Sequence, residues 1–338
     1  MMRRWTGVAL AVGVCLLAGA AAARAAEDIR KPLPAPLKVR QGMLNVPALS
    51  PLYLLPDEAK KYNIQIEQVM FQRFADARTA LASGDLELAA FGPQDITLAL
   101  AGGAKSLMGV AGLGAGNDCL MVRKGVAVNS WKDLEGKKIG VGAGSISWLK
   151  FVASVEEHGL DYKQLKVVNV MGGGANYQKA LQTGELDMAV VWQPFCAQGI
   201  VEGYGQYPGI DHNVSKLVGG WIAVLAVNRG FLEKNRDAVQ RLVLAYTDIL
   251  SFAKQNTDRW AQVYAEKAGL PLPVAKESIR ITSLDPRIPL ASIKRMSKFL
   301  ADRGVVQKDV SGEVDQYYTF EFLSRITGKS AAELGQGL

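Results

Sequence analysis

A long internal repeat constrains the fold of this chain more than any other feature of its sequence. Residues 79–93 read TALASGDLELAAFGP, and residues 179–194 read KALQTGELDMAVVWQP. Each copy has the pattern of a helix end, a glycine, a short apolar strand, and then an aromatic residue followed closely by proline. Five residues of the first copy recur at an offset of one hundred in the second: Ala80, Leu81, Gly84, Leu86 and Ala89. The repeat therefore predicts two lobes that share one architecture.

The same offset aligns the strand that opens each lobe. Lys38 and Gly42 correspond to Lys138 and Gly142. Strand and helix patterns alternate through both halves, which is typical of βαβ units and a largely parallel sheet. We therefore expect an α/β fold with two lobes and a ligand cleft between them.

The expected elements follow the repeat. Strand patterns cover residues 37–43, 63–70, 86–91, 106–112, 134–142, 165–171 and 186–192. Helical patterns cover residues 50–61, 75–82, 94–101, 147–158, 176–182, 194–202, 237–255, 258–268, 274–281 and 291–302. The expected division gives lobe one residues 37–118 plus 221–338, and lobe two residues 119–220.

Two apolar strand patterns lie at the seams between the lobes. Residues 119–123 follow the first lobe-one segment, and residues 221–227 follow lobe two. We expect each strand to cross between the lobes as a hinge, because rotation of a few backbone torsions there would close a cleft. The helices after residue 229 are expected to complete lobe one.

The first 25 residues have the features of a cleaved signal peptide. Arg3 and Arg4 precede an apolar run from residue 8 to residue 23, and Ala-Arg-Ala at 23–25 is a small-residue cleavage site. Export to the periplasm is therefore expected. Apolar residues make up 49% of the 338-residue chain, which is enough to form two cores after this segment is removed.

Charge gives no sign of a nucleic-acid partner. The formal charge is +7, and removal of residues 1–25 takes away three arginines and leaves a charge of about +4. The remaining lysines and arginines are dispersed, so they do not form a track for a phosphate backbone.

Two cysteines remain after the signal peptide, Cys119 and Cys196. One disulfide is possible in an oxidising compartment. Two separate buried thiols are favoured, because a chain of this size does not need a disulfide framework.

The sequence does not favour catalysis. His158 and His212 lie outside any nucleophile pattern, and the His, Cys and acidic residues lack metal-ligand spacing. Gly140–Gly144 follows a strand and precedes a helix, as a dinucleotide-binding loop would. Ser145, however, replaces the third glycine of G-x-G-x-x-G, and the next strand ends without an acid to hold a ribose. We expect a binding protein without a metal or a cofactor.

The same loop is a candidate seat for an anion or a polar group. Ser145, Ile146 and Ser147 open the predicted helix, where free amides and the positive helix end favour negative charge. The two serine hydroxyls are expected to be additional donors. The alternative is an ordinary helix cap.

Two aromatic residues occupy equivalent strand ends. Ligands in open α/β sheets bind beyond the carboxyl ends of the strands, so Phe91 and Trp192 could hold the apolar body of a ligand between the lobes. In the alternative interpretation each ring covers its own core. The other candidate ligand-binding residues lie at strand-to-helix junctions or at the hinge: Asn45, Phe71, Arg73, Gln94, Asp118, Asn176 and Gln193.

The charged candidate residues favour ligands of opposite charge. Arg73 could pair with a bound anion or with Asp76 on the surface. Asp95 and Asp118 would repel an anion if both lined the cleft, and they leave a cationic or pyrimidine-like ligand as the alternative. Asp95 could instead cap its helix, and Asp118 could brace the hinge.

Several motifs together resemble the nitrate/sulfonate/taurine class of ABC-transporter solute-binding proteins. They are the signal peptide, the doubled lobe, WKDLEGKKIGV at 131–141, the repeat at 180–189 and ADRGV at 301–305. The resemblance implies a type II periplasmic binding fold, a cleft that closes on a small molecule, and delivery to a membrane permease with its ATPase. From the candidate residues we expect the ligand to be a small organic anion with an apolar or aromatic body, and we expect the protein to be a monomer. A related branch resembles pyrimidine-synthesis proteins of thiamine formation. The cysteine-rich motif expected there is absent from this sequence, and the signal peptide argues against a cytosolic role.

Overall fold

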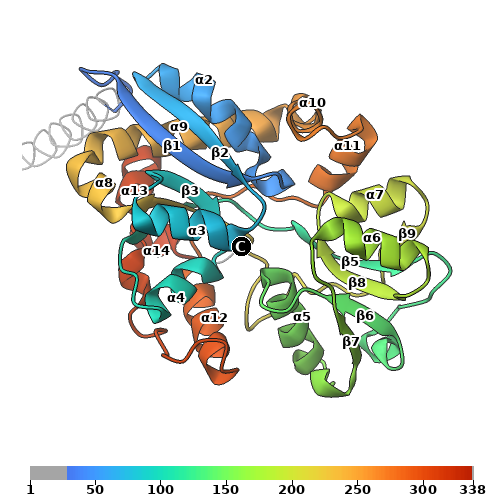
Figure 1. Ribbon diagram of the computed structural model, residues 1–338. Helices are drawn as coiled ribbons and strands as arrows, with labels where there is room; N and C mark the ends of the chain where they lie inside the picture. The colour runs from blue at the N-terminus through green and yellow to red at the C-terminus, as the bar shows by residue number, and fades with distance from the viewer. Residues whose placement is uncertain (1–28, 337–338) are drawn as a thin grey trace, which may run out of the picture.

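The computed structural model describes residues 29–336, which form two α/β lobes side by side (Figure 1). The predicted signal peptide lies outside the described residues. Within them, no helix combines the length and the apolar character that a membrane span requires.

Each lobe contains one five-stranded sheet. The lobe-one sheet has the order β2-β1-β3-β10-β4, and the lobe-two sheet has the order β7-β6-β8-β5-β9. One strand in each sheet, β10 or β5, is antiparallel to its neighbours, and the others run parallel. The predicted two-lobe α/β fold is confirmed. The strands are β1 Leu37–Leu44, β2 Ile64–Phe71, β3 Leu88–Phe91, β4 Leu107–Gly112, β5 Asp118–Arg123, β6 Lys138–Val141, β7 Lys166–Asn169, β8 Met188–Trp192, β9 Gly205–Gln206 and β10 Val224–Asn228.

Helices flank both sheets. The lobe-two helices are α5 Ile146–Glu157, α6 Gly174–Gln182 and α7 Phe195–Val201. The remaining α-helices are α2 Leu55–Lys60, α3 Phe74–Ser83, α4 Gln94–Ala101, α8 Arg229–Lys234, α9 Arg236–Gln255, α10 Thr257–Ala268, α11 Leu272–Arg280, α12 Leu290–Asp302, α13 Glu321–Thr327 and α14 Ala331–Leu334. Four 3-10 segments are η1 Pro47–Leu54, η2 Trp131–Leu134, η3 Tyr162–Gln164 and η4 Val314–Tyr317.

Most helices agree with the sequence patterns to within a few residues, and the helix predicted over 50–61 is the clearest exception. Its first part is the 3-10 segment η1, and the α-helix begins only at Leu55. Pro51 lies inside η1, and its missing N–H group explains why a regular α-helix does not start earlier.

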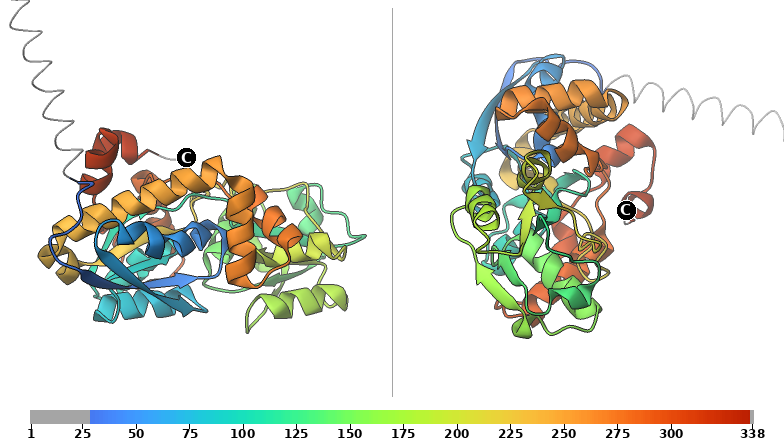
Figure 2. Two further views of the ribbon diagram at one scale, coloured as in Figure 1. Left: turned by 90° about the horizontal axis from the view of Figure 1, so that it is seen from above. Right: turned by 90° about the vertical axis from the view of Figure 1, so that its right-hand side faces the viewer.

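The long helix α9 covers one side of lobe one (Figure 2). Val239, Leu242, Tyr246 and Ile249 are buried at the three- and four-residue spacing that forms one helix face. This face belongs to the large core cluster that contains the buried residues of lobe one, and α9 contacts α2, η1 and α13.

The structure corrects the predicted register of the opening strands. Gly42 pairs with Ala89 in lobe one, and Gly140 pairs with Ala189 in lobe two, so Gly140 and not Gly142 is the counterpart of Gly42. A Cβ atom at Gly42 would lie 2.5 Å from Leu86 Cδ1, and one at Gly140 would lie 2.4 Å from the equivalent leucine of lobe two. The opening strands β1 and β6 therefore align at an offset of 98 residues, whereas the repeat at residues 79–93 recurs at an offset of one hundred.

The hinge prediction is also corrected. β5 lies within the lobe-two sheet and β10 within the lobe-one sheet, because each pairs with the central strand of its own lobe. The chain crosses between the lobes just before each strand, where Ala115 forms bridges with both Trp221 and Ser283. Three backbone segments thus run side by side at the crossing.

The third crossing segment comes from the C-terminal part of the chain. Ala115 N donates to Ser283 O at 2.8 Å, and Ser283 N donates to Ala115 O at 2.8 Å. Gly114 has φ of +102°, and a Cβ there would lie 1.7 Å from Ser283 O, so only glycine permits this backbone contact. Helix α11, just before this segment, packs on α7 of lobe two. The C-terminal region therefore contacts both lobes, whereas the sequence led us to expect lobe one alone.

Cys119 and Cys196 form a disulfide. The expectation that favoured two separate thiols is wrong for this structure. Both residues belong to one buried cluster of lobe two, because the first turn of α7 packs against β5.

Candidate ligand-binding cleft

A pocket of about 410 Å³ lies between the two lobes, beyond the carboxyl ends of the parallel strands. Seven of the predicted ligand-binding residues line it: Arg73, Gln94, Asp118, Ser145, Ile146, Ser147 and Trp192. The others of the pocket are Leu44, Val46, Gln72, Phe74, Ala75, Arg78, Asp95, Leu98, Asn117, Ala143, Gly144 and Ile222. Both lobes therefore contribute to one site, in the place where open α/β sheets bind ligands.

Lobe two contributes the N-terminus of α5. Ser145 is the N-cap, and its Oγ accepts a hydrogen bond from Trp148 N at 3.1 Å. The preceding Gly144 adopts φ of +83°, which turns the chain into the helix. Since the first amides of a helix have no partner within it, Ile146 and Ser147 can offer N–H donors to the pocket. The cap interpretation is correct, and the amides remain available beside it.

Ser147 does not have the role expected of its hydroxyl. Its Oγ donates to Asp118 Oδ1 at 2.5 Å, so its only proton is already engaged within the protein. Towards a ligand the Ser147 hydroxyl is therefore an acceptor, and the donors on this side are backbone amides and the hydroxyl of Ser145.

A buried ion pair lies directly behind the N-terminus of α5. Lys150 Nζ is 2.6 Å from Asp118 Oδ2, and the two side chains are 0% and 1% exposed. Lys150 also donates to Gly220 O at 3.2 Å and to Asn213 Oδ1 at 3.3 Å. The negative charge of Asp118 is thus compensated inside the protein. Lys150 was not among the residues predicted from the sequence, because long-range packing brings its partners Asp118, Asn213 and Gly220 to it.

Lobe one contributes a second ion pair. Arg78 of α3 lies 2.7 Å from Asp95 of α4, and the Asp95 side chain is 2% exposed. Burial raises the pKa of the Asp95 carboxyl to about 6, although Arg78 opposes that shift. Arg73 lines the pocket, and it also pairs with Asp76 at 2.6 Å. The alternative in which Arg73 pairs with Asp76 on the surface is therefore correct.

Only one of the two predicted aromatic residues lines the pocket. Trp192 does, and its ring packs edge-to-face against Tyr177 and Phe195 with centroid distances of 6.1 and 5.8 Å. Phe91 is fully buried in the lobe-one core and does not line the pocket. Its strand is central in the sheet and is covered by packed elements, whereas Phe74 at the start of α3 reaches the pocket instead.

Two further lobe-one candidates lie outside the pocket lining. Asn45 Oδ1 accepts from Tyr53 Oη at 3.1 Å, so this side chain is directed to η1. The Phe71 ring packs beside Gly42 and the lobe-one core. The neighbouring residue Gln72 lines the pocket in its place.

The remaining two candidates, both in lobe two, also lie outside it. Asn176 is exposed, and its Nδ2 donates to Met171 O at 2.7 Å, which fixes the turn before α6. Gln193 is fully buried, and its Oε1 accepts from Ala197 N at 3.0 Å. Both side chains therefore serve local structure.

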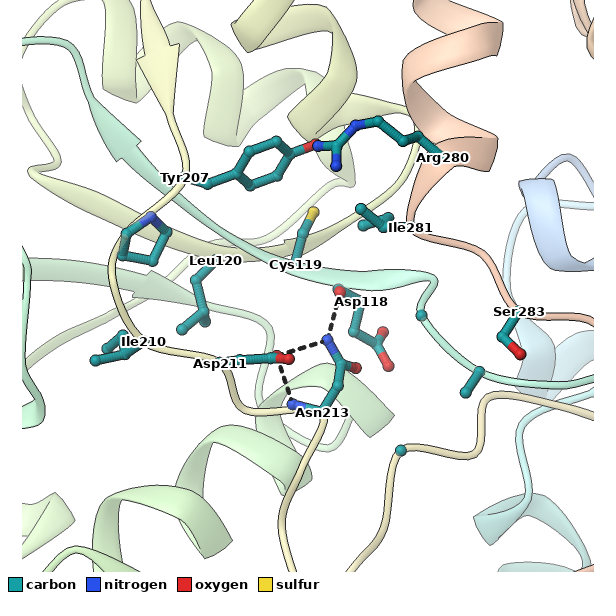
Figure 3. A pocket seen from close by; sticks show the side chains of 14 residues that line it. Asp118, Cys119, Leu120, Tyr207, Ile210, Asp211, Asn213, Arg280, Ile281 and Ser283 are labelled. Atoms are coloured by element: carbon teal, nitrogen blue, oxygen red, sulfur yellow. Dashed lines mark hydrogen bonds between the residues drawn. The ribbon is translucent and has the colours of Figure 1, made fainter. Parts of the chain in front are cut away.

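A second pocket of about 440 Å³ lies beside the crossing segments (Figure 3). Arg280 lies over the ring of Tyr207, 5.6 Å from its centroid. Asn213 Nδ2 donates to Asp118 O at 3.0 Å on the same side. Because all three crossing segments line this pocket, its shape depends on how the lobes are placed.

Neither of the two histidines is among the described residues that line the cleft. His212 is fully buried, and burial lowers its pKa to about 4, so it is neutral near pH 7. His158 stacks on Trp131 at a centroid distance of 4.6 Å. Among residues 29–336, no group of three or more His, Cys, Asp or Glu side chains could hold a metal ion.

Comparison with solved structures identifies the fold. The chain resembles the alkanesulfonate-binding protein SsuA of Xanthomonas axonopodis bound to MOPS (TM-score 0.71, 17% identity, 85% of this chain and 100% of that one). It also resembles the periplasmic aliphatic sulphonate-binding protein SsuA of Escherichia coli (TM-score 0.73, 20% identity, 83% and 97%). A third match is the periplasmic nitrate-binding protein NrtA of Synechocystis (TM-score 0.67, 12% identity, 88% and 90%).

Sequence comparison identifies the family. No curated protein matches the chain. The model of the family described as NMT1/THI5 like matches residues 60–259, more than half of the 338 residues. The match includes both copies of the repeat and most of the cleft, and we conclude that the chain belongs to the NMT1/THI5-like family.

Proposed function

We propose that this protein is the exported solute-binding component of an ABC importer. In this role it captures a small organic anion between its lobes in the periplasm and delivers it, as a monomer, to a membrane permease with its ATPase. The family and the fold shared with periplasmic sulfonate- and nitrate-binding proteins support the proposal.

The charge balance of the cleft is the main observation in favour of an anionic ligand. The two acids that would repel an anion are each paired with a cation, Asp118 with Lys150 and Asp95 with Arg78. The positive end of α5 is then left to select the charge of the ligand. Such a helix end favours an anion by about 0.3–1 kcal/mol when exposed and up to ~2 kcal/mol when partly buried.

The apolar walls define the body of the ligand. Trp192 faces the pocket from lobe two, and Phe74 and Leu98 line it from lobe one. Rigid rings and aliphatic side chains bury apolar surface without requiring a polar partner. The volume of about 410 Å³ suits a small ligand with an apolar or aromatic body and a carboxylate or sulfonate head.

The rival function is an enzyme of the pyrimidine-precursor type. Neither His158 nor His212 is among the described residues that line the cleft, and the acids that do line it, Asp95 and Asp118, are paired with Arg78 and Lys150, which supports binding over acid–base chemistry. Turnover distinguishes the two functions. Steady consumption of a bound compound by the purified protein would overturn the binding proposal.

Native mass spectrometry of the protein taken from its own periplasm tests the ligand directly. We expect a bound mass that corresponds to a small organic acid. Deletion of the gene should then abolish high-affinity uptake of that compound. If uptake continues unchanged, the protein serves a sensor or another receptor, and the importer proposal is wrong.

A further inference from the structure

Three hydrogen-bond acceptors are buried in the cleft without a partner. They are Gln94 Oε1, Asp95 Oδ2 and Asn117 Oδ1, and their residues are 6%, 2% and 2% exposed. All three residues line the inter-lobe pocket. Elsewhere in residues 29–336, the buried side-chain atoms without a partner are ring or guanidinium nitrogens and tyrosine hydroxyls. Carbonyl and carboxylate oxygens of this kind are therefore concentrated at the candidate site.

A buried oxygen of this kind is stabilised when a donor forms a hydrogen bond to it. A buried polar atom that loses its hydrogen bond to water is destabilising by about 1–3 kcal/mol, and native proteins contain few of them. An amide side chain can turn to present either its oxygen or its nitrogen. The Asp95 carboxylate cannot, since an ionised carboxylate only accepts. Asp95 therefore determines the chemistry of this wall.

Arg78 leaves one carboxylate oxygen for another donor. It donates to Asp95 Oδ1 at 2.7 Å, which fixes the carboxylate on the side of α3. The second oxygen, Oδ2, accepts no hydrogen bond within the described chain, although the backbone N–H of Gly92 is close enough to the carboxyl group to help lower its pKa. A carboxylate accepts several hydrogen bonds, so a donor at Oδ2 completes the pair without displacing Arg78.

The two lobes thus present opposite hydrogen-bonding characters to one pocket. Lobe two offers donors at the start of α5, and lobe one with the adjacent Asn117 offers acceptors. We propose that the ligand has two polar ends: an acid group held at Ser145–Ser147, and an N–H group that donates to Asp95 Oδ2, with Gln94 and Asn117 beside it. This inference rests on the proposed function and specifies the far end of the ligand.

Three para-substituted aromatic probes test the inference by calorimetry. Para-aminobenzoate carries both ends, para-toluate replaces its amino group with a methyl group, and para-toluidine carries the amino group without the acid. Amino and methyl groups have similar size, but the methyl group is apolar, so para-aminobenzoate binds more tightly than para-toluate only if its N–H groups find an acceptor that offsets their loss of water. We expect para-aminobenzoate to bind roughly tenfold more tightly than para-toluate, because a donor to a buried carboxylate is worth more than a neutral hydrogen bond.

Asp95→Asn identifies the acceptor. An asparagine that accepts from Arg78 through its oxygen turns its NH₂ group to the ligand, so the advantage of para-aminobenzoate should disappear or reverse. Asp76→Asn is the matched control, because it removes a carboxylate from an exposed Arg–Asp pair at the start of α3. We expect the control to keep the ratio of the two affinities. Thermal unfolding of both variants reports whether they are folded.

Each outcome separates the two proposals. Equal or weaker binding of para-aminobenzoate by the wild-type protein, relative to para-toluate, overturns the inference and leaves the anionic ligand standing. The inference is also wrong if the Asp95→Asn variant is folded and keeps the full advantage. Binding of para-toluidine alone, with both acids rejected, overturns the proposed anionic ligand itself. Loss of the advantage in Asp95→Asn alone supports the inference.

Discussion

Lys150 and Asp118 form a buried ion pair that joins the ligand seat to the crossing between the lobes. The Nζ–Oδ2 distance is 2.6 Å, and both side chains are inaccessible to solvent. Asp118 also accepts from Ser147 at the start of α5, and Lys150 also donates to Gly220 O at the crossing. The pair therefore fixes the helix end that is proposed to hold the anion.

Replacement of Lys150 by methionine should destabilise the protein by about 3–5 kcal/mol, because it leaves the Asp118 carboxylate buried without a cation. Urea unfolding measures this loss. The double variant Lys150→Met/Asp118→Leu should recover much of it, since no uncompensated charge remains. If the single variant loses less than about 1 kcal/mol, the pair is not the buried unit that the geometry indicates.

The sequence predicted the parts of the site that depend on local structure. Ser145 follows a glycine-rich turn and precedes an apolar helix pattern, so the helix start and its free amides could be located without tertiary information. Trp192 was located by the repeat. The repeat also predicted two lobes of one architecture, and both sheets show the same pairing, Gly42 with Ala89 and Gly140 with Ala189, although the sequence had aligned Gly42 with Gly142.

The parts that the sequence did not predict depend on long-range packing. Phe91 and Trp192 have the same local pattern, yet only Trp192 lines the cleft. The hinge was misplaced because β5 and β10 pair with distant strands, which an apolar pattern does not reveal. Lys150 and Asn117 are recognisable only when the crossing segments are in place.

Replacement of Trp192 by alanine should weaken ligand binding by about 1–3 kcal/mol and leave most of the stability intact, because the ring lines the pocket. Phe91→Ala is the contrasting variant. Its ring is in the lobe-one core, so it should reduce the free energy of unfolding by roughly 3–5 kcal/mol. Calorimetry and urea unfolding measure the two effects. A Trp192→Ala variant with full affinity and reduced stability would assign that ring to the core.

The preference for an N–H-bearing ligand should depend on pH through Asp95. Its pKa is raised to about 6 by burial, and the groups that face it are Arg78 from α3 and the buried Tyr318 hydroxyl, whose own pKa is raised well above its usual value. Above pH about 6 the carboxylate is ionised and accepts. As the pH falls below about 6, the affinity ratio of para-aminobenzoate to para-toluate should fall from roughly tenfold towards about one, because protonation of Asp95 removes the acceptor.

Both probes carry a benzoate carboxylate, so the effect of its titration on binding largely cancels when their affinities are compared as a ratio. The Asp95→Asn variant provides the baseline and should show a smaller pH dependence of the ratio. The sign for stability is opposite: the folded-state pKa is above the ordinary value of 3.8, so ionisation of Asp95 opposes folding as the pH rises from about 3.8 through about 6. A ratio that is constant between pH about 5 and about 7.5 would contradict the role of Asp95.

Ligand binding should close the lobes about the three crossing segments near Ala115, Trp221 and Ser283. Small-angle X-ray scattering should show a smaller radius of gyration at saturation with ligand. Arg303, which directly follows α12, and Glu156 of α5 form an ion pair between the lobes, so Arg303→Ala should weaken binding by roughly twofold to fivefold without touching the cleft.

Arg236→Ala is the control for this change. Arg236 forms the same kind of pair with Glu321 within lobe one, so its loss should leave the affinity unchanged. An unchanged radius of gyration on ligand saturation, together with equal affinities of both variants and the wild-type protein, would show that the lobes do not move about these segments.

The disulfide between Cys119 and Cys196 should contribute substantially to the stability of lobe two. It links β5 to the first turn of α7 across a sequence separation of 77 residues, and a loop of that length corresponds to roughly 4–5 kcal/mol of unfolded-state entropy in the simplest model, with observed losses of about 2–5 kcal/mol. Reduction should therefore lower the unfolding midpoint. The Cys119→Ser/Cys196→Ser variant should start at the lower midpoint and be insensitive to reductant, which separates the bond from other effects of the reagent.

Alkylation of the unreduced, unfolded mature protein followed by mass spectrometry measures the bond directly. Modification of both cysteines without prior reduction would show that they are thiols, as the sequence alone favoured.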